Sequence, residues 1–363
     1  MYIIFALMNT KKKIEIKGLT ISELEKYFLS IGDKKFRASQ VFNWLYNNLV
    51  SKFEDMGTLP KGLRKKLSQD FTLETLTLKT TQSSNLSATK KFLYSTQDDY
   101  AIETVLIPGG ERNTLCISTQ VGCPLDCKFC ATGLMGFKRN LTVGEIVDQY
   151  FLTAKDVGKN VITNIVFMGM GEPLINFQNT MAALDIFTNQ HNNRISRNRI
   201  TVSTSGIPEN IRVLADSPYR IKLALSLHST FDDIRSRIMP INKRFPLADV
   251  LDAIRYYSRI TDTRITFEYV MLKGINDREE DIRALTKLCR SLPSKLNVIP
   301  FNSIAHMSPE GISKELVPTS LYDIDKFVTK LRDNNITVMV RDTQGDDIAA
   351  ACGQLATQNI KLT

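Results

Sequence analysis

After residue 110 the chain alternates short apolar segments with amphipathic segments of helical length. The apolar segments cover 114–120, 163–169, 199–204, 220–227, 264–272, 295–300 and 336–341, and the amphipathic segments cover 142–157, 176–189, 246–260, 279–291 and 319–334. Repeated β-α units of this kind favour a parallel sheet covered by helices, either open or closed into a full or partial barrel. In both arrangements the reactive residues lie in loops after the C-terminal ends of the strands.

In the first 110 residues the apolar side chains recur at other spacings. Residues 20–70 place apolar side chains at helical spacing, whereas residues 71–107 alternate apolar and polar side chains as paired strands do. We therefore predict an α/β chain in four parts. These are a basic helical N-terminal domain over residues 1–72, a β extension with a hairpin over 73–108, a β-α core over 109–345 and a C-terminal segment over 346–363.

The composition excludes several classes of protein. With 43% hydrophobic and 23% charged residues, the chain is not disordered, collagen-like or a coiled coil. No uncharged apolar run reaches the ~18 residues of a membrane-spanning helix. The apolar residues 1–8 precede the basic run at 11–13, whereas a secretory signal begins with its positive charges. We expect a cytoplasmic protein without a membrane partner.

Positive charge is concentrated near the N-terminus. The net charge of the chain is +9, and residues 1–70 carry 13 basic against 7 acidic side chains. Such an excess indicates a polyanionic partner, most simply a nucleic acid. A charged, solvated surface would give the same counts.

Three cysteines form the motif with the most specific chemistry. Cys123, Cys127 and Cys130 have the spacing C-x3-C-x2-C, in the loop after the strand that ends near Gln120. Three thiolates in a tight loop can hold three irons of a [4Fe–4S] cluster and leave the fourth iron open to a small molecule. The alternative is a structural zinc site, but zinc usually takes four protein ligands, often as two cysteine pairs, and the sequence has no second pair.

This cysteine loop after a first β-strand resembles the cluster motif of radical S-adenosylmethionine (SAM) enzymes. The resemblance implies a partial (β/α)6 barrel and an open iron that binds the amino and carboxylate groups of SAM. The cluster then supplies the electron that cleaves SAM to methionine and a 5′-deoxyadenosyl radical. One β-α unit later, Gly171 and Glu172 resemble the SAM amino-binding motif of this superfamily.

Other candidates for SAM binding follow later strands. They are Ser203, Ser226, Leu227, His228 and Asn302. A helix cap or a satisfied strand-end group explains any single one of them equally well, but several in the same register favour a shared binding site.

Three further cysteines stand outside the cluster motif. Cys352 follows the last predicted strand, in a segment whose flanking residues Gly345 and Gly353 permit a mobile loop. Cys116 lies on the strand before the cluster loop. Cys289 lies in an amphipathic segment, where a buried, inert thiol is expected.

Together with their flanking segments, these residues resemble the RlmN/Cfr family of adenosine methyltransferases. The matching segments are 102–108, 114–116, 120–123, 136–141, 168–173 and 351–355. The resemblance implies that Cys352 is methylated and carries the methyl group, that Cys116 resolves the intermediate through a transient disulfide, and that Glu103 accepts a proton. It also implies two substrates, position 2503 of 23S rRNA and position 37 of tRNA. Pro173 favours the carbon 2 (RlmN) branch over the carbon 8 (Cfr) branch.

The chemistry explains why two cysteines and a cluster are needed. Carbon 2 of adenine is electron-poor, so it does not attack the electrophilic methyl group of SAM, whereas a thiolate at Cys352 does. A second SAM molecule, cleaved at the cluster, generates a carbon radical on this methyl group, which adds to the ring. Loss of the ring proton, aided by Cys116 or Glu103, and attack of Cys116 on the Cys352 sulfur release the methylated base. The resulting disulfide would be transient in the cytosol.

The same chemistry predicts the partners. The target base leaves its stack to reach the barrel mouth, an electron donor such as flavodoxin or ferredoxin reduces the cluster, and the chain is expected to be a monomer. Basic residues that can hold the RNA backbone are Lys11, Lys12, Lys13, Arg64, Lys65, Lys66, Arg235, Arg237, Lys243 and Arg244. Two other classes stay open, a metal-dependent RNA-binding module without activity and an electron-transfer protein. The second of these needs neither SAM-binding strand ends nor a remote thiol.

Overall fold

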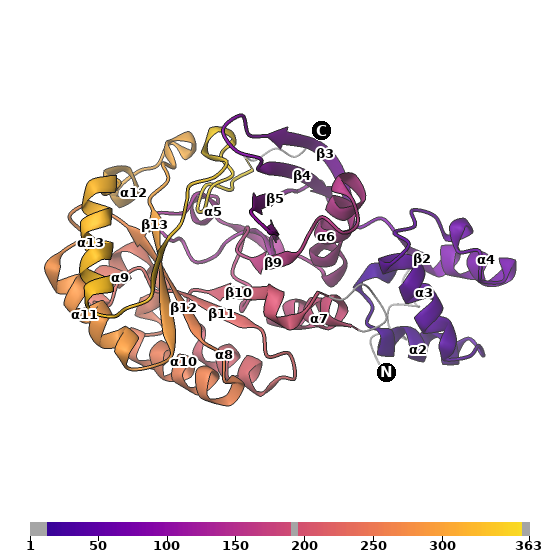
Figure 1. The fold of residues 1–363 in the computed structure, drawn as a ribbon. Coiled ribbons are helices and arrows are strands. Elements are labelled where there is room, and N and C mark those ends of the chain that lie inside the picture. Colours follow the sequence, from indigo (N-terminus) through magenta and orange to yellow (C-terminus); the bar gives the residue numbers. More distant parts are fainter. Residues whose placement is uncertain (1–12, 190–194, 358–363) are drawn as a thin grey trace.

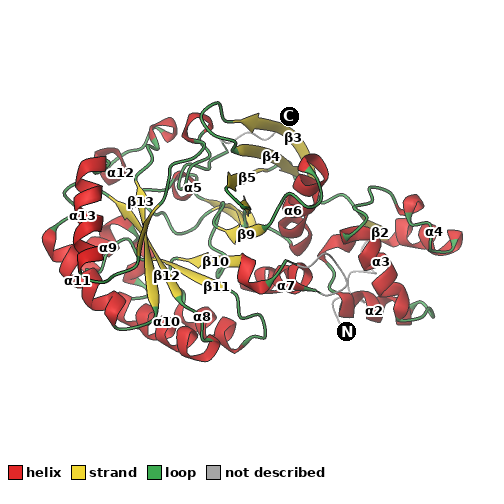
Figure 2. Cartoon of the chain, viewed as in Figure 1, coloured by secondary structure: helices red, strands yellow, loops and turns green. Residues whose placement is uncertain are grey.

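The computed structural model describes residues 13–189 and 195–357. Its main element is a ten-stranded sheet in the order β14-β13-β12-β11-β10-β9-β6-β5-β4-β3. The strands are β3 Leu76–Ser83, β4 Lys90–Thr96, β5 Ala101–Gly109, β6 Arg112–Cys116, β9 Asn164–Phe167, β10 Ile200–Thr204, β11 Lys222–Ser226, β12 Ile265–Met271, β13 Ser294–Pro300 and β14 Val338–Val340. The sheet curves, and helices lie outside it (Figures 1 and 2).

The sheet strands from β6 to β14 are parallel, and each lies beside its predecessor. The connections contain α6 Val143–Val157, α7 Phe177–Thr188, α8 Pro208–Asp216, α9 Asp232–Ile238, α10 Leu247–Thr261, α11 Glu279–Arg290, α12 Ile312–Glu315 and α13 Leu321–Asp333. This confirms the predicted α/β fold with a partial (β/α)6 barrel, to which the short strand β14 adds a seventh parallel strand. The edge strands β3 and β14 do not pair with each other in the described part of the chain, so the barrel is open there.

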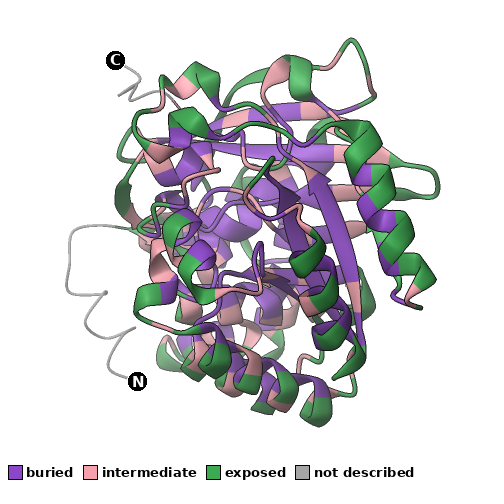
Figure 3. Cartoon of the chain, turned by 90° about the vertical axis from the view of Figure 1, so that its left-hand side faces the viewer, coloured by how far each residue is buried: buried purple, intermediate pink, exposed green. Residues whose placement is uncertain are grey.

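The parallel strands are buried because helices cover one face and the barrel interior covers the other. Strand β12 is buried at every position, including its charged residue Glu268. Helix α10 shows the complementary pattern, since it buries Val250, Ile254 and Tyr257 on one face. Figure 3 shows buried strands inside and exposed helix surfaces outside.

The strands predicted between residues 71 and 107 continue the barrel sheet. β5 pairs with β6, β4 with β5 and β3 with β4, all antiparallel. The β3–β4 hairpin therefore forms the edge of the sheet opposite to β14. The C-terminal segment after β14 crosses to this hairpin, because Asp347 bonds to Ser84 and Asn85 at its turn.

The N-terminal helices lie to one side of the barrel (Figure 1). They are α2 Ile21–Ser30, α3 Phe36–Tyr46 and α4 Lys61–Asp70, and β1 Ile14–Glu15 pairs with β2 Phe71–Thr72 beside them. Tyr27, Phe28 and Phe42 are fully buried among these helices. A buried ion pair between Lys17 Nζ and Asp148 Oδ1 on α6, 2.6 Å long, joins the helices to the barrel. None of the helices in the described residues is long and apolar enough to cross a membrane.

Candidate active site

A cavity of about 150 Å³ lies at the C-terminal ends of the parallel strands. The three cysteines of the predicted cluster motif line it, and so does Cys352 from the C-terminal segment. Other lining residues are Met168, Gly171, Glu172, Ser203, Ser226, His228, Glu268, Asn302 and Arg341. Residues from the cysteine loop, from strands β9 to β14 or the loops after them, and from the C-terminal segment thus meet at one edge of the sheet, because parallel strands end on the same side.

Backbone hydrogen bonds shape the cysteine loop, such as those from the Cys123 N–H to the Gly136 carbonyl oxygen (3.0 Å) and from the Cys130 N–H to the Cys127 carbonyl oxygen (3.1 Å). The loop leaves β7 Gln120–Gly122, which pairs with β8 Phe137–Asn140, and ends at the single-turn helix α5 Ala131–Leu134. Gly122 has a φ of +75°, and a Cβ there would lie 1.9 Å from the carbonyl oxygen of Gly136. Glycine is therefore required for the close approach of the two strands that carry the loop.

The three thiols fit an iron–sulfur cluster. Burial raises the pKa of each thiol, to about 12 for Cys123, and the sulfurs of Cys127 and Cys130 repel each other as anions. A cationic centre that binds all three removes both penalties. Among the described residues, no group of three His, Cys, Asp or Glu side chains converges on the position of a single metal ion. A [4Fe–4S] cluster instead takes one iron per thiolate, so the donor set suits a cluster better than a zinc ion.

Gly171 and Glu172 form a rigid edge of the cavity. Gly171 has a φ of +101°, and a Cβ there would lie 2.5 Å from Cβ of Gln120. The buried Glu172 carboxylate accepts hydrogen bonds from the backbone N–H groups of Ser205 (2.7 Å) and Leu174 (3.0 Å). Burial raises the pKa of Glu172, and these N–H groups oppose the rise by stabilising the carboxylate.

Not all of the other residues predicted at strand ends line the cavity. Ser203, Ser226 and His228 line the cavity, whereas Leu227 is buried in the core and does not line it. Nδ1 of His228 accepts from the backbone N–H of Val270, so Nε2 carries the proton. Burial, with a smaller effect of Arg235, lowers the pKa of His228 to about 3 and keeps the ring neutral.

Asn302 also lines the cavity, and it contacts the C-terminal segment. Its Nδ2 donates to the carbonyl oxygen of Cys352 (3.0 Å), and its Oδ1 accepts from Oγ1 of Thr343 (3.2 Å). Asn302 therefore links the strand-end residues to the loop that holds Cys352.

Arg235 is not a surface cation, so its predicted contact with the RNA backbone is wrong. It is fully buried, and burial lowers the pKa of its guanidinium to about 10. Its guanidinium donates to the carbonyl oxygens of Leu227, Ser205 and Ser226 and to Oδ1 of Asn242. Arg235 therefore ties the loops after β10 and β11 together beside the cavity.

Replacing Arg235 by methionine is expected to reduce the free energy of unfolding by about 3 kcal/mol, because buried carbonyl groups lose a charged donor. Chemical denaturation measures this. Arg237→Met, on the exposed face of the same helix α9, is the matched control and should change stability by less than about 0.5 kcal/mol. Equal effects of the two substitutions would contradict the structural role of Arg235.

Cys352 lies close to the cluster cysteines. The carbonyl oxygen of Gly353 accepts from the backbone N–H of Ala131 (2.7 Å), so the residues that follow Cys352 and Cys130 are bonded to each other. Cys352 also lines a second cavity of about 120 Å³ together with Cys116. The two cavities meet at Cys352, which is accessible from both.

Arg341 follows β14 and lies between the two cavities. Its Nη1 is 3.5 Å from Sγ of Cys352 and its Nη2 is 3.8 Å from Sδ of Met168. Burial raises the pKa of Cys116 to about 12 and also raises that of Cys352, and the positive charge of Arg341 opposes both shifts. Arg341 is therefore the cation that favours the thiolate at both positions.

Glu103 lies on β5 and lines neither of these two cavities. Its Oε1 is 2.9 Å from Nζ of Lys91, and its Oε2 accepts from the backbone N–H of Ala356 (3.0 Å). Burial raises the pKa of Glu103, while the positive charge of Lys91 opposes the rise. In this structure both carboxylate oxygens of Glu103 are therefore engaged, one by Lys91 on β4 and the other by the backbone of the C-terminal segment.

Three charged residues in or beside the site were not predicted from the sequence. Arg341 ends a predicted strand, so the rule that found Ser203 could also have found it. Glu268 is a charged residue within an apolar strand, which is itself a signal of function. The pairing of Lys91 with Glu103 leaves no signal in the sequence, because it depends on the register of two antiparallel strands.

A cluster loop at the mouth of an open β-α barrel places the chain among the radical SAM enzymes, and residues 117–286 match the Radical SAM superfamily. Residues 14–73 match the Ribosomal RNA large subunit methyltransferase N-terminal domain. The chain belongs to the RlmN family. It is 43% identical to the Dual-specificity RNA methyltransferase RlmN of Geobacter sulfurreducens over 342 residues, 94% of this chain and 92% of that protein. It is 40% identical to the protein of the same name from Alcanivorax borkumensis over 360 residues, 97% of this chain and 92% of that protein.

A solved structure agrees with this assignment. The crystal structure of a radical SAM methyltransferase from Sphaerobacter thermophilus has a TM-score of 0.87 and 40% sequence identity, and the match covers 94% of this chain and 99% of that chain. The predicted resemblance to RlmN, the radical SAM fold and the assignment as an enzyme are confirmed. Membership of this superfamily implies a [4Fe–4S] cluster and SAM.

Proposed function

We propose that the chain methylates carbon 2 of adenosine in both 23S rRNA and tRNA, with Cys352 as the methyl carrier. The observation that carries the proposal is the position of Cys352. It shares one cavity with Cys123, Cys127 and Cys130 and a second cavity with Cys116. A carrier must meet the methyl donor on one side and the resolving thiol on the other, and no other described cysteine lines both cavities.

The residues of the chain have separate tasks in this scheme. When bound, the cluster supplies the electron that cleaves SAM. Glu172 and the strand-end residues Ser203, Ser226, His228 and Asn302 would bind and orient SAM, since they line the cavity beside the cysteines. The Cys352 thiolate, favoured by Arg341, attacks the methyl group of a first SAM molecule, forms a sulfur–carbon bond and expels S-adenosylhomocysteine.

Release of the product needs the second thiol. The 5′-deoxyadenosyl radical from a second SAM molecule would take a hydrogen atom from the S-methyl group, and the resulting carbon radical would add to carbon 2 of the ring, which then loses its proton and one electron. The Cys116 thiolate attacks the sulfur of Cys352, the carbon–sulfur bond breaks with its electron pair left on the carbon, this carbon takes up a proton to become the methyl group, and a disulfide forms. A second SAM molecule is consumed per turnover in this scheme. The disulfide must be reduced before the next cycle, which suits the reducing cytoplasm, and a flavodoxin or ferredoxin would supply the electron for the cluster.

The identity of the product tests the proposed function. The reconstituted enzyme is incubated without oxygen with SAM, a reductant and 23S rRNA or tRNA. The RNA is then digested to nucleosides, mass spectrometry identifies the methylated adenosine, and its chromatographic retention identifies the methylated carbon. The proposal predicts 2-methyladenosine from both RNAs. Methylation at carbon 8, or binding of RNA without any turnover of SAM, would overturn it.

Exposed cations in two parts of the chain are the proposed contacts for the RNA backbone. Arg237, Lys243 and Arg244 are exposed on and after α9, and Lys65 and Lys66 are exposed on α4. Lys11 and Lys12 lie outside the described residues. Lys13 donates to the backbone carbonyl oxygen of Ser68 on α4. The excess of basic side chains near the N-terminus supports residues 1–72 as an accessory RNA-binding domain beside a monomeric catalytic core.

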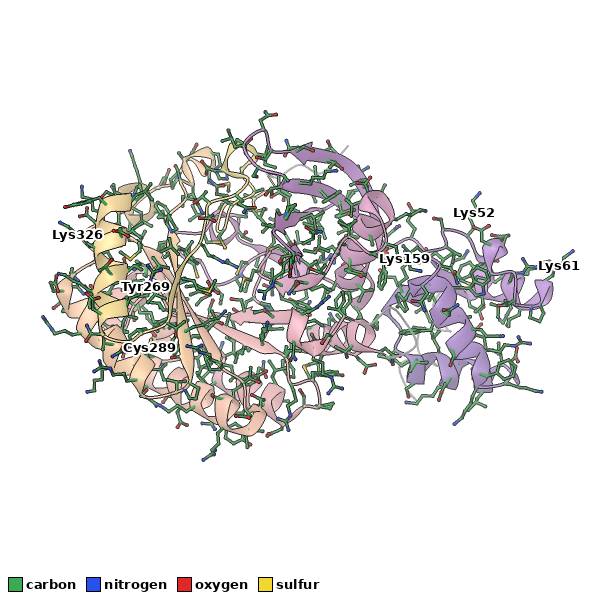
Figure 4. The ribbon with its side chains drawn as sticks, viewed as in Figure 1. Lys52, Lys61, Lys159, Tyr269, Cys289 and Lys326 are labelled. Atoms are coloured by element: carbon green, nitrogen blue, oxygen red, sulfur yellow. The ribbon has the colours of Figure 1, made fainter. Side chains whose placement is uncertain are left out.

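Removing the charges of Arg237, Lys243 and Arg244 together by alanine is expected to weaken RNA binding. The logarithm of the RNA association constant falls with the logarithm of the salt concentration, and the steepness of this fall should decrease by about 2, because each lost phosphate contact removes ~0.7–0.9. The control replaces three exposed cations of equal total charge on α11 and α13, Arg283, Lys287 and Lys326 (Lys326 is labelled in Figure 4). A fluorescence anisotropy titration over a range of salt concentrations that gives equal slopes for both triple variants would contradict the proposed contact surface.

A further inference from the structure

The β3–β4 hairpin contacts the C-terminal segment at its turn. Asp347 accepts a hydrogen bond from Oγ of Ser84 (2.7 Å) and another from the backbone N–H of Asn85 (2.8 Å). Gly345 packs against the hairpin nearby, since a Cβ there would lie 2.9 Å from Cγ2 of Thr89. These contacts join residues that are more than 250 positions apart in the sequence.

A second set of contacts lies further along the hairpin. Nζ of Lys91 donates to the carbonyl oxygen of Ala349 (3.4 Å) and pairs with Glu103. Glu103 in turn accepts from the backbone N–H of Ala356. The ion pair therefore holds the chain on both sides of Cys352.

Within the C-terminal segment, hydrogen bonds close local turns, such as those from the Ala350 N–H to the Gly345 carbonyl oxygen (2.8 Å) and from Gln354 Nε2 to Asp346 Oδ1 (2.6 Å). Its regular structure after β14 is a 3-10 turn at Asp346–Ile348 within the described residues. Gly345, Ala349 and Gly353 have φ values of +74°, +48° and +84°. A segment of this kind loses conformational entropy when it is ordered, so its position depends on contacts with the rest of the protein.

We propose that Asp347 and Lys91 are positioning residues that seat the Cys352 loop on the β3–β4 hairpin and so hold the methyl-carrier sulfur between the two cavities. Neither side chain touches the reacting sulfur, so both act through the loop. The effect of this contact on catalysis rests on the proposed function, whereas the contact between the hairpin and the Cys352 loop is a property of the fold.

Asp347 provides the cleaner test of the two residues. It is exposed, and exposed hydrogen bonds contribute little to global stability. Its loss should therefore loosen the loop without unfolding the protein. Loss of Lys91 also leaves the buried Glu103 without its counter-ion, so Lys91→Met is compared with Lys91→Arg, which keeps the charge.

The experiment uses the full-length chain with its cluster reconstituted. Hydrogen exchange detected by mass spectrometry follows the peptide that covers residues 342–357 in Asp347→Ala, Ser84→Ala and the double variant. Asp342→Ala, an exposed acid of the same segment, and Lys90→Met, the neighbour of Lys91, are matched controls. Steady-state methylation of RNA gives kcat and KM for each variant.

Asp347→Ala should raise the exchange rate of this peptide roughly threefold to tenfold and lower kcat by a similar factor, with KM for RNA and the melting temperature unchanged. Adding Ser84→Ala to Asp347→Ala should change the exchange of this peptide little further, because the hydrogen bond between the two side chains is already lost in Asp347→Ala. Lys91→Arg should restore most of what Lys91→Met loses.

An exchange rate in Asp347→Ala equal to that in Asp342→Ala would overturn the contact between the hairpin and the loop. Faster exchange with unchanged kcat would overturn the role of Asp347 in positioning the methyl-carrier sulfur. If the enzyme proves not to make 2-methyladenosine, the proposed function fails, while the exchange measurement still decides whether the hairpin holds the loop.

Discussion

Replacement of Cys352 by alanine is expected to abolish RNA methylation, with a loss of at least about 10³-fold in turnover. The side chain lines the cavity of the cluster cysteines and lies 3.5 Å from the guanidinium of Arg341. Removing a covalent nucleophile usually costs several orders of magnitude, because no neighbouring group can replace the bond that it forms. The measurement is the transfer of labelled methyl groups from SAM to RNA.

Cys289→Ala is the matched control for Cys352→Ala. Cys289 is buried on α11 (labelled in Figure 4) and lines neither cavity, so its replacement should leave turnover nearly unchanged. The iron and sulfide content of both variants must equal that of the parent enzyme. If Cys352→Ala retains more than a few per cent of the parent activity under these conditions, the methyl group does not pass through this sulfur.

Replacement of Cys116 by alanine is expected to stop the reaction after the carbon–carbon bond has formed. Cys116 shares the second cavity with Cys352, and no other described cysteine lines it. Without this thiol the bond between the Cys352 sulfur and the methyl carbon is not cleaved. The variant should therefore accumulate RNA that is covalently linked to protein, and multiple turnover should fall by about 10³-fold.

Denaturing gel electrophoresis with labelled RNA detects this adduct. The double variant that also lacks Cys352 provides the control, because it has no sulfur to link and should show no adduct. A Cys116→Ala enzyme that turns over normally, or an adduct that persists in the double variant, would contradict the proposed roles of the two cysteines.

Most of the barrel could be predicted from the sequence because its signals are local. The predicted strand at 264–272 appears as Ile265–Met271, and the predicted helix at 279–291 appears as Glu279–Arg290. Apolar runs and helical periodicity depend on neighbouring residues alone. The parallel topology then required the strand-end residues to gather at one edge, as they do.

Contacts between distant segments could not be predicted in this way. In the sequence, Arg235 is one of several neighbouring basic residues and does not differ from them, yet it is completely buried beside the loops after β10 and β11. The bond between Asp347 and Ser84 depends on the path of the C-terminal segment across the open side of the barrel. Tertiary packing decides both, and neither residue type has a local pattern that reveals it.

The passage of the methyl group through Cys352 is tested most directly in a single turnover. The enzyme is prepared with a carbon-labelled methyl group on Cys352 and is mixed with unlabelled SAM and RNA. Mass spectrometry then determines whether the first methylated adenosine contains the label. We expect this product to contain the labelled carbon and the label to disappear from the Cys352 peptide. A first product that carries unlabelled carbon, with the label still on Cys352, would contradict it.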